Sequence, residues 1–591
     1  MSAGNRTLRA SVLLFFLTFL SATVRAAEPV LPGDLEQTIV QAYRSGNKQV
    51  VIPPGIYRLA PTPQGPHLWL DNLSDFDIDA TGARLIFTDR TRAGIEFDHC
   101  RNVRFRGATV AYAVPPFTQG VVEVISPDGK YYDIRIDDGY PAELDDPRYF
   151  PRKAIGYLFD PKTRWWKPGA FDLYGTRTER LGPRRFRVYW SKPLPPDVQP
   201  VAAGDLIAFR GSGPHNILVL DSQNVELSGV TIYNSPDFAV LESGGEGGNH
   251  YTFNVERGPA PEGASAAPLL SSTADAFHSV NVRRGPVLED CHFESMGDDG
   301  IAIHGTFSYV MEASGDRLIL SKSTFRPGDP IRLFDTRDRP AGEAIVQTVA
   351  PLAHYQSSEE SRRSTLADNT NGPYVAVTIR PALPAGFDYL ATNPAAEGSG
   401  YVVRNNTIRN HRARGMLLKA EDGLVEGNLI DGSTMGGIVL TPEFWWNEAG
   451  YSRHVIVRDN TIRHVAYAPK QLGGLVLAAL DPAPVEGCGN EDIRIERNHL
   501  VDINGVNLLI TSACGVFVRQ NQFLNSQRVI AAAAGEAWGE DPRALVVVTQ
   551  SRDVDFEDNV VSGLGPFDIL PLKVLPPATV RGTAAGLRVQ P

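Results

Sequence analysis

The chain has 591 residues, with 57 Lys and Arg against 68 Asp and Glu, and its formal net charge is −11 at pH 7. It contains no basic tract, which argues against a nucleic-acid partner because binding to a polyanion needs clustered cations. We therefore expect a neutral partner. The chain is too long for one ordinary hydrophobic core, so it must form several domains or one elongated repeat structure.

The first residues have the pattern of an export signal. Arg6 and Arg9 precede an apolar run over residues 11–20, and Ala26 suits cleavage at the end of the segment. This pattern predicts a signal peptide over residues 1–26 and a periplasmic or secreted protein. The apolar run is shorter than the roughly 20 helical residues that cross a bilayer, so no membrane span is expected.

The segment after the signal predicts the end of a solenoid. Residues 34–43 begin with an N-cap Asp and have helical spacing, and residues 49–57 read as strand, turn and strand. We expect a short helix here that closes one end of a repeat structure.

A short sequence motif then recurs along the chain: a strand of alternating apolar and polar residues, an Asn or Asp, and a second apolar pair. Its final Asn recurs at steps of 22, 32, 38, 23 and 38 residues, at Asn406, Asn428, Asn460, Asn498, Asn521 and Asn559. A base period near 22 fits a coil of three short strands, each stacked about 4.8 Å above the last. The sequence thus predicts an all-β fold, a right-handed parallel β-helix with Asn at left-handed corners forming a ladder. A propeller is the alternative, but its blade period of about 40 leaves the 22-residue steps unexplained.

Two stretches interrupt the repeat, and each contains a similar element, residues 204–209 in one and 328–334 in the other. We interpret them as two inserted β-barrel or sandwich subdomains that wall one side of the helix. The predicted organisation is a signal peptide (1–26), an N-terminal cap with the first coils (27–112), an inserted barrel (113–210), coils with an acidic site (211–305), a second inserted barrel (306–400) and C-terminal coils (401–591).

The four cysteines are far apart and show no C-x-x-C spacing, which indicates neither a zinc site nor a disulfide scaffold. We interpret Cys100, Cys291, Cys488 and Cys514 as buried free thiols, although export would permit a bridge.

The densest group of functional residue types spans two neighbouring coils. Asp275 lies 24 residues before Asp299, which is one coil. Phe277 should then stack on Ile301 inside the helix, while His278, Asp298 and His304 share the outward face. If the second insertion is skipped, Arg414 aligns with Asp299 and Lys419 with His304.

Such crowding of carboxylates suits acid–base chemistry. Like charges close together split their pKa values, so one carboxyl stays protonated while another is ionised. A general acid and a general base are the pair that glycoside hydrolysis needs. We expect Asp275, Asp298 and Asp299 to be catalytic, with His278, His304, Arg414 and Lys419 binding substrate. Strand spacing predicts a carboxyl separation of roughly 6.5–9.5 Å, which leaves room for a water and favours inversion.

Other interpretations of these residues stay open. An Asp at a β-helix corner often only caps a turn. A metal site from the histidines and aspartates has no diagnostic spacing, so neither a metal nor another cofactor is predicted, although calcium would suit a polysaccharide lyase. In a later loop, Trp446 next to Glu448 offers a flat apolar surface and an acceptor for sugar hydroxyls, while core packing of one Trp is the alternative.

In this order the motifs resemble glycoside hydrolase family 110, the exo-acting α-1,3-galactosidases of bacteria. The matching pieces are Asp275 with His278, residues 298–305, residues 412–415, and Trp446 to Gly450. The resemblance implies a β-helix with inserted barrels, inverting hydrolysis of terminal α-1,3-linked galactose without a cofactor, and catalytic roles for Asp298, Asp299 and Asp275. Ala302 and Asn447 depart from the family pattern and leave the exact galactoside open.

Two other functions compete with this one. A polygalacturonase-like hydrolase or a lyase would act on an acidic polysaccharide, whose carboxylate Arg414 and Lys419 would receive. A non-catalytic glycan-binding β-helix would bind through the acidic cluster without turnover. Solenoid ends and barrels also offer surfaces for a homodimer.

Overall fold

The computed structural model describes residues 34–590, apart from 151–153, 191–200, 336–338, 357–371, 383–388, 469–472, 478–484, 486, 530–540, 542 and 583–585. The predicted signal peptide lies outside the described residues. Within the described part of the chain, no helix is long and apolar enough to cross a membrane.

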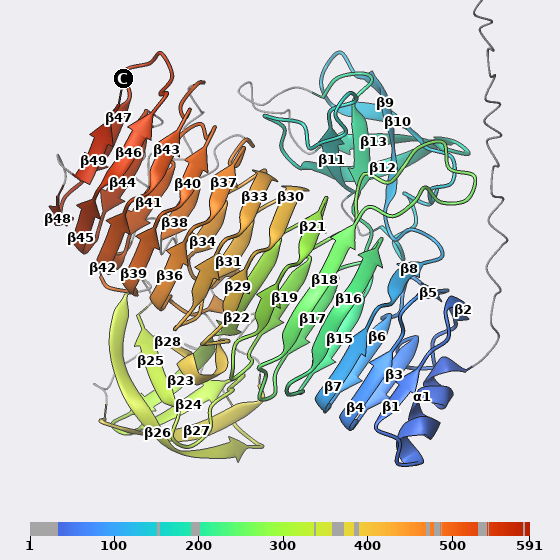
Figure 1. Ribbon diagram of the computed structural model, residues 1–591, viewed down its shortest axis with the longest axis horizontal. Coiled ribbons are helices and arrows are strands. Elements are labelled where there is room, and N and C mark those ends of the chain that lie inside the picture. Colours follow the sequence, from blue (N-terminus) through green and yellow to red (C-terminus); the bar gives the residue numbers. More distant parts are fainter. Residues whose placement is uncertain are drawn as a thin grey trace, which may run out of the picture.

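The predicted helix caps the first coil. Helix α1 (Leu35–Arg44) begins at Asp34, whose side chain accepts a hydrogen bond from the backbone N–H of Gln37. Leu35 and Ile39 are buried against the core of the first coils. The helix therefore closes the apolar interior at the N-terminal end (Figure 1).

Parallel strands stack into the three faces of a β-helix, as the repeat predicts (Figure 1). The first face comprises β1 (Gln49–Val51), β4 (Ser74–Asp79), β7 (Arg101–Arg106), β16 (Glu226–Tyr233), β18 (His250–Glu256), β20 (Val287–Glu289), β29 (Val402–Arg404), β32 (Leu424–Glu426), β36 (Arg453–Arg458), β39 (Asn490–Glu496), β42 (Ala513–Arg519), β45 (Arg552–Glu557) and β48 (Val580–Arg581).

Strands β16 and β18 continue into the second face. Its other strands are β2 (Gly55–Leu59), β5 (Ala83–Phe87), β8 (Thr109–Tyr112), β21 (His292–Glu294), β30 (Thr407–His411), β33 (Leu429–Ser433), β37 (Thr461–Arg463), β40 (His499–Val501), β43 (Gln522–Leu524), β46 (Asn559–Ser562) and β49 (Leu587–Val589).

The third face positions the candidate site. It comprises β3 (Leu68–Asp71), β6 (Ile95–Asp98), β15 (Ile217–Leu220), β17 (Val240–Ser243), β19 (Phe277–Val280), β22 (Ile301–Thr306), β31 (Met416–Leu418), β34 (Ile438–Leu440), β38 (Leu475–Leu477), β41 (Leu508–Thr511), β44 (Ala544–Thr549) and β47 (Leu570–Val574).

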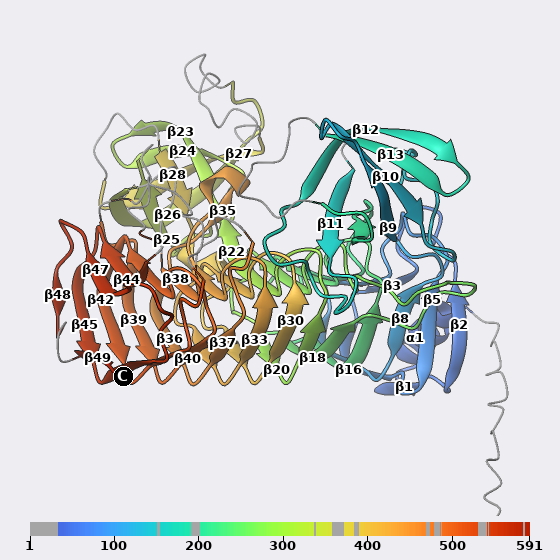
Figure 2. The same ribbon diagram turned by 90° about the horizontal axis from the view of Figure 1, so that it is seen from above.

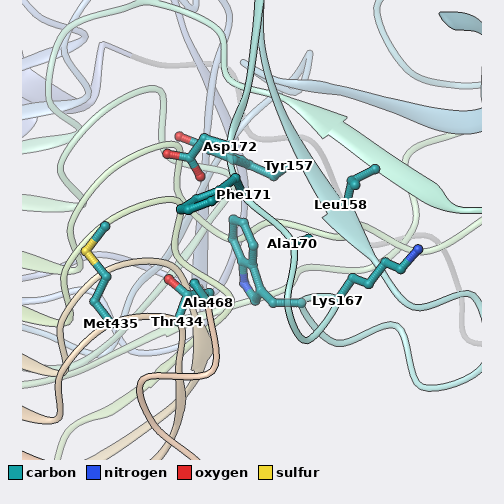
Figure 3. A pocket seen from close by; sticks show the side chains of 10 residues that line it. Tyr157, Leu158, Lys167, Ala170, Phe171, Asp172, Thr434, Met435 and Ala468 are labelled. Carbon is teal, nitrogen blue, oxygen red and sulfur yellow. The ribbon is translucent and has the colours of Figure 1, made fainter. Parts of the chain in front are cut away.

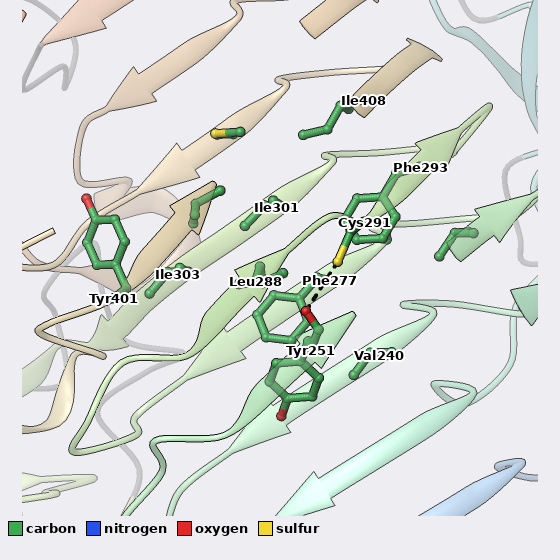
Figure 4. Close-up of a cluster of buried hydrophobic side chains, with 14 of the residues drawn as sticks. Val240, Tyr251, Phe277, Leu288, Cys291, Phe293, Ile301, Ile303, Tyr401 and Ile408 are labelled. Atoms are coloured by element: carbon green, nitrogen blue, oxygen red, sulfur yellow. Dashed lines mark hydrogen bonds between the residues drawn. The ribbon is translucent and has the colours of Figure 1, made fainter. Parts of the chain in front are cut away.

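An apolar column fills the interior of the helix. Phe277 pairs with Ile301, Ile301 with Met416, and Met416 with Ile438, which confirms the predicted register across the second insertion. All four side chains are buried. Figure 4 shows Phe277 and Ile301 among the other aromatic and aliphatic side chains of this column. Because inward and outward side chains alternate along a strand, this packing also fixes which residues face outward.

The Asn ladder forms as predicted in the C-terminal coils. Asn406 donates its side-chain N–H to the carbonyl oxygen of the Asn428 side chain at 3.0 Å, and the same bond repeats through Asn460, Asn498, Asn521 and Asn559. The left-handed conformation, however, belongs to the preceding residue: Asn405 has φ 57°, and Asp459, Arg497, Gln520 and Asp558 are similar. The expectation that the ladder Asn itself sits in that conformation is therefore wrong. The turn residue frees the next side chain to point inward.

Each predicted insertion is a closed antiparallel barrel of six strands, and Figure 2 shows both barrels on one side of the helix. The first comprises β9 (Thr118–Ile125), β10 (Tyr131–Ile136), β11 (Ile155–Phe159), β12 (Leu173–Gly182), β13 (Arg185–Trp190) and β14 (Leu206–Phe209). The second comprises β23 (Ser308–Ser314), β24 (Arg317–Ser321), β25 (Pro330–Phe334), β26 (Pro340–Leu352), β27 (Tyr374–Arg380) and β28 (Tyr389–Thr392). Two short 3-10 helices, η2 (Pro394–Ala396) and η3 (Phe444–Trp446), lie near the second barrel.

The cysteines correct one expectation. Cys100 and Cys291 are buried free thiols, but Cys488 and Cys514 form a disulfide. Their separation of 26 residues is close to one coil, so stacking brings the two side chains together. The interpretation of all four as free thiols is therefore wrong for this pair.

Candidate active site

Three carboxyl groups converge where the chain enters neighbouring strands of the third face. Asp275 precedes β19, and Asp298 and Asp299 precede β22. One oxygen from each lies within 4.8 Å of the others. The backbone N–H of Asp299 donates to Oδ1 of Asp275 at 3.2 Å, and the backbone N–H of Arg414 donates to Oδ1 of Asp299 at 2.7 Å. Each coil thus hydrogen-bonds the carboxyl group of the coil before it.

Carboxyl oxygens from neighbouring coils lie close together. Strand spacing predicted a separation of roughly 6.5–9.5 Å between carboxyl groups, as in many inverting glycosidases. One oxygen each of Asp275, Asp298 and Asp299 lies within 4.8 Å of the others. This distance joins the nearest oxygen atoms rather than whole carboxyl groups, so the predicted separation stays a prediction.

Burial changes the proton affinity of two members. Asp275 and Asp299 are about 5% exposed, whereas the Asp298 side chain is 24% exposed. Burial, together with the charge of Asp298, raises the pKa of Asp275 well above its ordinary value. Burial also raises the pKa of Asp299, although Arg414 opposes it. Because two neighbouring acids titrate as a pair, the cluster holds a proton where an isolated aspartate would not.

Asp298 is held by two arginines that sequence reasoning did not place in the site. Arg412 Nη1 lies 2.5 Å from Oδ1 of Asp298, and Arg210 Nη1 lies 3.5 Å from Oδ2. Asp172 anchors Arg412 at 2.9 Å, and Asp237 contacts Arg210 at 3.4 Å. The motif at residues 412–415 was a signal for Arg412, whereas nothing in the sequence pointed to Asp172 or Arg210.

Asp172 reaches the site from the first barrel. It belongs to the segment that joins β11 to β12 and lines a small pocket where the barrel meets the helix. Figure 3 shows Asp172 and Phe171 of the barrel across this pocket from Thr434 and Met435 of the coils. The insertion therefore supplies a charged group to the ion pairs around Asp298.

The predicted histidines form a chain behind Asp275. His278 Nδ1 lies 2.8 Å from Oδ2 of Asp275, and His278 Nε2 lies 2.8 Å from Nε2 of His304. His304 Nδ1 lies 2.6 Å from the carbonyl oxygen of Gly305. Burial lowers the pKa of both imidazoles to about 4. Phe238 stacks on His278 with ring centroids 4.2 Å apart and fixes its plane.

The predicted cations are already paired. Arg414 contacts Asp299 at 3.3 Å and Glu443 at 2.9 Å, while Lys419 contacts Glu443 at 3.0 Å and also bonds Glu448. Although burial opposes it, Lys419 holds the pKa of Glu448 well below its ordinary range. Glu443 was not among the predicted site residues, and its position beside the aromatic run was the signal for it.

The aromatic loop lies beside this network. Strand β35 (Glu448–Ala449) pairs antiparallel with β22, which brings Glu448 to the third face. Phe444 is buried and stacks on Phe307 at the start of the second barrel, with centroids 4.9 Å apart. Trp446 is 69% exposed, so it is not the core residue that the alternative interpretation proposed.

At the site, two groups of side chains have the residue types of a metal site: the three aspartates, and His278 with His304 and Glu448. The two imidazole Nε2 atoms are 2.8 Å apart. Two nitrogen ligands of one tetrahedral zinc stand roughly 3.3 Å apart, so this geometry fits a hydrogen bond better than shared coordination.

The carboxyl cluster lies at one corner of a parallel β-helix. The chain is a distant relative of bacterial α-1,3-galactosidases. It is 25% identical over 500 residues to α-1,3-galactosidase B of Akkermansia muciniphila, covering 80% of this chain and 59% of the relative. It is 23% identical over 416 residues to α-1,3-galactosidase B of Bacteroides thetaiotaomicron, covering 67% and 64%. The chain thus spans about three fifths of the length of these relatives, and the likeness read from the motifs is confirmed.

No family model matches the chain. Among solved structures, a family 28 exopolygalacturonase from Yersinia enterocolitica has a TM-score of 0.39 at 14% identity, covering 94% of this chain and 74% of that one. At this score the likeness carries no argument about function.

Proposed function

We propose that the protein is an exo-acting glycoside hydrolase that removes terminal α-1,3-linked galactose from glycans with inversion of the anomeric centre. One observation carries the proposal: Asp275, Asp298 and Asp299 bring carboxyl oxygens within 4.8 Å of one another on adjacent coils. Burial gives two of them raised pKa values. A cluster that shares protons in this way supplies both a general acid and a general base.

The close spacing suits activation of a water. Two hydrogen bonds of about 2.8 Å to one water span up to about 5.6 Å, so a water can bridge two of these carboxyl oxygens. Such a water is the nucleophile of an inverting hydrolase, while the remaining carboxyl protonates the leaving sugar. The resemblance of the motifs to family 110 also supports inversion.

Charge favours a neutral substrate over a uronic acid. The cations around the cluster are Arg210, Arg412, Arg414 and Lys419, and each already contacts at least one carboxylate. Six carboxyl groups contact these four cations, and Asp275 lies beside two of them: the six are Asp172, Asp237, Asp298, Asp299, Glu443 and Glu448. An acidic sugar would add charge to a network that is already negative, so a polygalacturonase-like activity is the weaker proposal.

We also propose that the protein is exported. The N-terminal signal pattern supports this location. The Cys488–Cys514 disulfide supports it too, because such bonds persist in oxidising compartments.

The first test is an NMR time course with galactose-α-1,3-galactose. We expect β-galactose to appear before mutarotation. Initial α-galactose would contradict inversion. If no galactose is released from this disaccharide or from a nitrophenyl galactoside, activity on an acidic polysaccharide or glycan binding without turnover becomes the better proposal.

The second test replaces the carboxyl groups one at a time. Asp275→Asn, Asp298→Asn and Asp299→Asn should each lower kcat by about 10³-fold, because each removes an ionisable group from the reacting centre. Melting temperature should stay within about 3 °C of the unsubstituted protein. Retained hydrolysis in these single variants would overturn the site assignment.

A further inference from the structure

When His278 is neutral, the hydrogen-bond chain behind Asp275 has two consistent proton arrangements. The carbonyl of Gly305 can only accept, so Nδ1 of His304 must carry a hydrogen. If His304 is neutral, its Nε2 carries no hydrogen and can only accept a hydrogen bond. The 2.8 Å contact between the two Nε2 atoms then requires that Nε2 of His278 carries the hydrogen. A neutral His278 protonated there has a bare Nδ1, so the hydrogen of the 2.8 Å bond to Asp275 belongs to the carboxyl group.

The second arrangement differs by one coordinated shift. The Asp275 carboxyl hydrogen moves to Nδ1 of His278, and the Nε2 hydrogen of His278 moves to Nε2 of His304. The number of protons is unchanged. Asp275 becomes a carboxylate, His278 stays neutral, and His304 becomes an imidazolium.

Glu448 stabilises that positive charge on His304 against the burial that opposes it. The His304 Nε2 lies 4.0 Å from Oε1 of Glu448, and Lys419 holds Glu448 in place on its other side. The charge therefore moves away from the reacting centre toward an acidic group. The groups whose charges act on the two imidazoles are Glu448, Lys419, Asp298 and Glu443, and His215 and Asp237 lie beyond the Phe238 ring.

We propose that Asp275, His278 and His304 form a proton relay that rests with the proton on Asp275 and passes one to His304 when Asp275 must accept a proton from water. This inference rests on the proposed hydrolase function. His278 and His304 act as positioning residues that set the protonation of Asp275. The raised pKa of Asp275 and the lowered pKa values of both histidines agree with the resting state.

The resting state can be tested without activity. In the full chain labelled with ¹⁵N-histidine, NMR should show His278 protonated on Nε2 and His304 on Nδ1 at neutral pH. The signals are assigned by their loss in His278→Gln and His304→Gln. A His278 protonated on Nδ1 at neutral pH would overturn the resting state.

The relay itself is tested by His304→Gln. Glutamine can still accept the hydrogen bond from His278 but cannot take up a proton, so Asp275 stays protonated to higher pH. We expect kcat/KM on galactose-α-1,3-galactose to fall about 10²-fold at neutral pH, with the acidic limb of its pH profile moving at least about one unit upward. A merely structural role would lower activity without moving that limb, and an unmoved limb overturns the relay.

His411→Gln is the matched control. His411 is also fully buried, its pKa is also lowered by burial to about 4, and it also bonds a backbone carbonyl through Nδ1. Its Nε2 meets the hydroxyl of Ser433 at 2.8 Å rather than a second imidazole. The acidic limb should therefore stay in place in this variant. If galactoside hydrolysis itself is absent, the tautomer measurement still decides the relay.

Discussion

The two inserted barrels have the same number of strands but meet the candidate site differently. The first delivers charge, because Asp172 and Arg210 enter the ion pairs around Asp298. The second contributes an apolar contact, because Phe307 at its start stacks on Phe444 of the aromatic loop. Its exit also places Glu397 behind the site strand, where a side chain at Gly305 would overlap it. An insertion thus acts on the site through its connecting segments rather than through its own core.

If the first barrel acts on the site through the charge of Asp172, Asp172→Asn should change the measured quantity more than the two other substitutions below do. Losing the anchor of Arg412 frees this guanidinium from its position beside Asp298, so kcat should fall about 100-fold with KM within about threefold. Steady-state kinetics on galactose-α-1,3-galactose measures this. Asp145→Asn is the control, since Asp145 forms an ion pair with Arg180 elsewhere in the same barrel. Equal effects of the two variants would contradict a specific role for Asp172.

The exit of the second barrel should act on stability instead. Glu397 is 1% exposed, and burial raises its pKa to about 8 although Arg332 opposes the shift. The folded protein therefore keeps a proton that the unfolded chain releases above its ordinary pKa near 4.5. Stability from this group is present at low pH and is lost as pH rises toward 8.

Chemical unfolding at pH 5 and pH 8 checks this prediction. Glu397→Gln should remove about 3.5 kcal/mol of the decrease in unfolding free energy between these values. Glu343→Gln is the control, because the Glu343 side chain is 55% exposed. A pH dependence that survives in Glu397→Gln would show that this carboxyl is ionised in the folded state.

The aromatic loop should give the smallest effect. Trp446→Ala removes an exposed ring, so KM for a galactosyl oligosaccharide should rise about three- to tenfold with kcat unchanged, in line with the worth of one stacking contact. Trp69→Ala is the control, as this ring is 42% exposed on β3 in the first coils. A change in kcat alone would mean that Trp446 does not bind the sugar.

The features that could be predicted from the sequence are those that depend on the length of the coil repeat. One coil separates Asp275 from Asp299 by 24 residues, and one coil separates Met416 from Ile438 by 22. This repeat keeps one inward apolar position in each coil, so the polar residues next to those positions are also aligned from coil to coil. The barrels were predictable because they interrupt that period.

Contacts that cross between distant segments were not predictable. Asp172 meets Arg412 across 240 residues and a barrel junction, and no local pattern encodes that distance. The backbone hydrogen bond from Asp299 to the Asp275 carboxyl group was not predictable either. The disulfide was missed because a spacing of 26 residues becomes meaningful only once the coil is known.

The Asn ladder has a consequence for how such a protein can evolve. Along the ladder from Asn406 to Asn559, each Asn donates its side-chain N–H to the next Asn and accepts one from the Asn before it, so the rungs are alike. A whole coil deleted or duplicated there would leave ends that still match. Evolution can then change the number of C-terminal coils one at a time. Such a change leaves the carboxyl cluster, which lies in earlier coils, undisturbed.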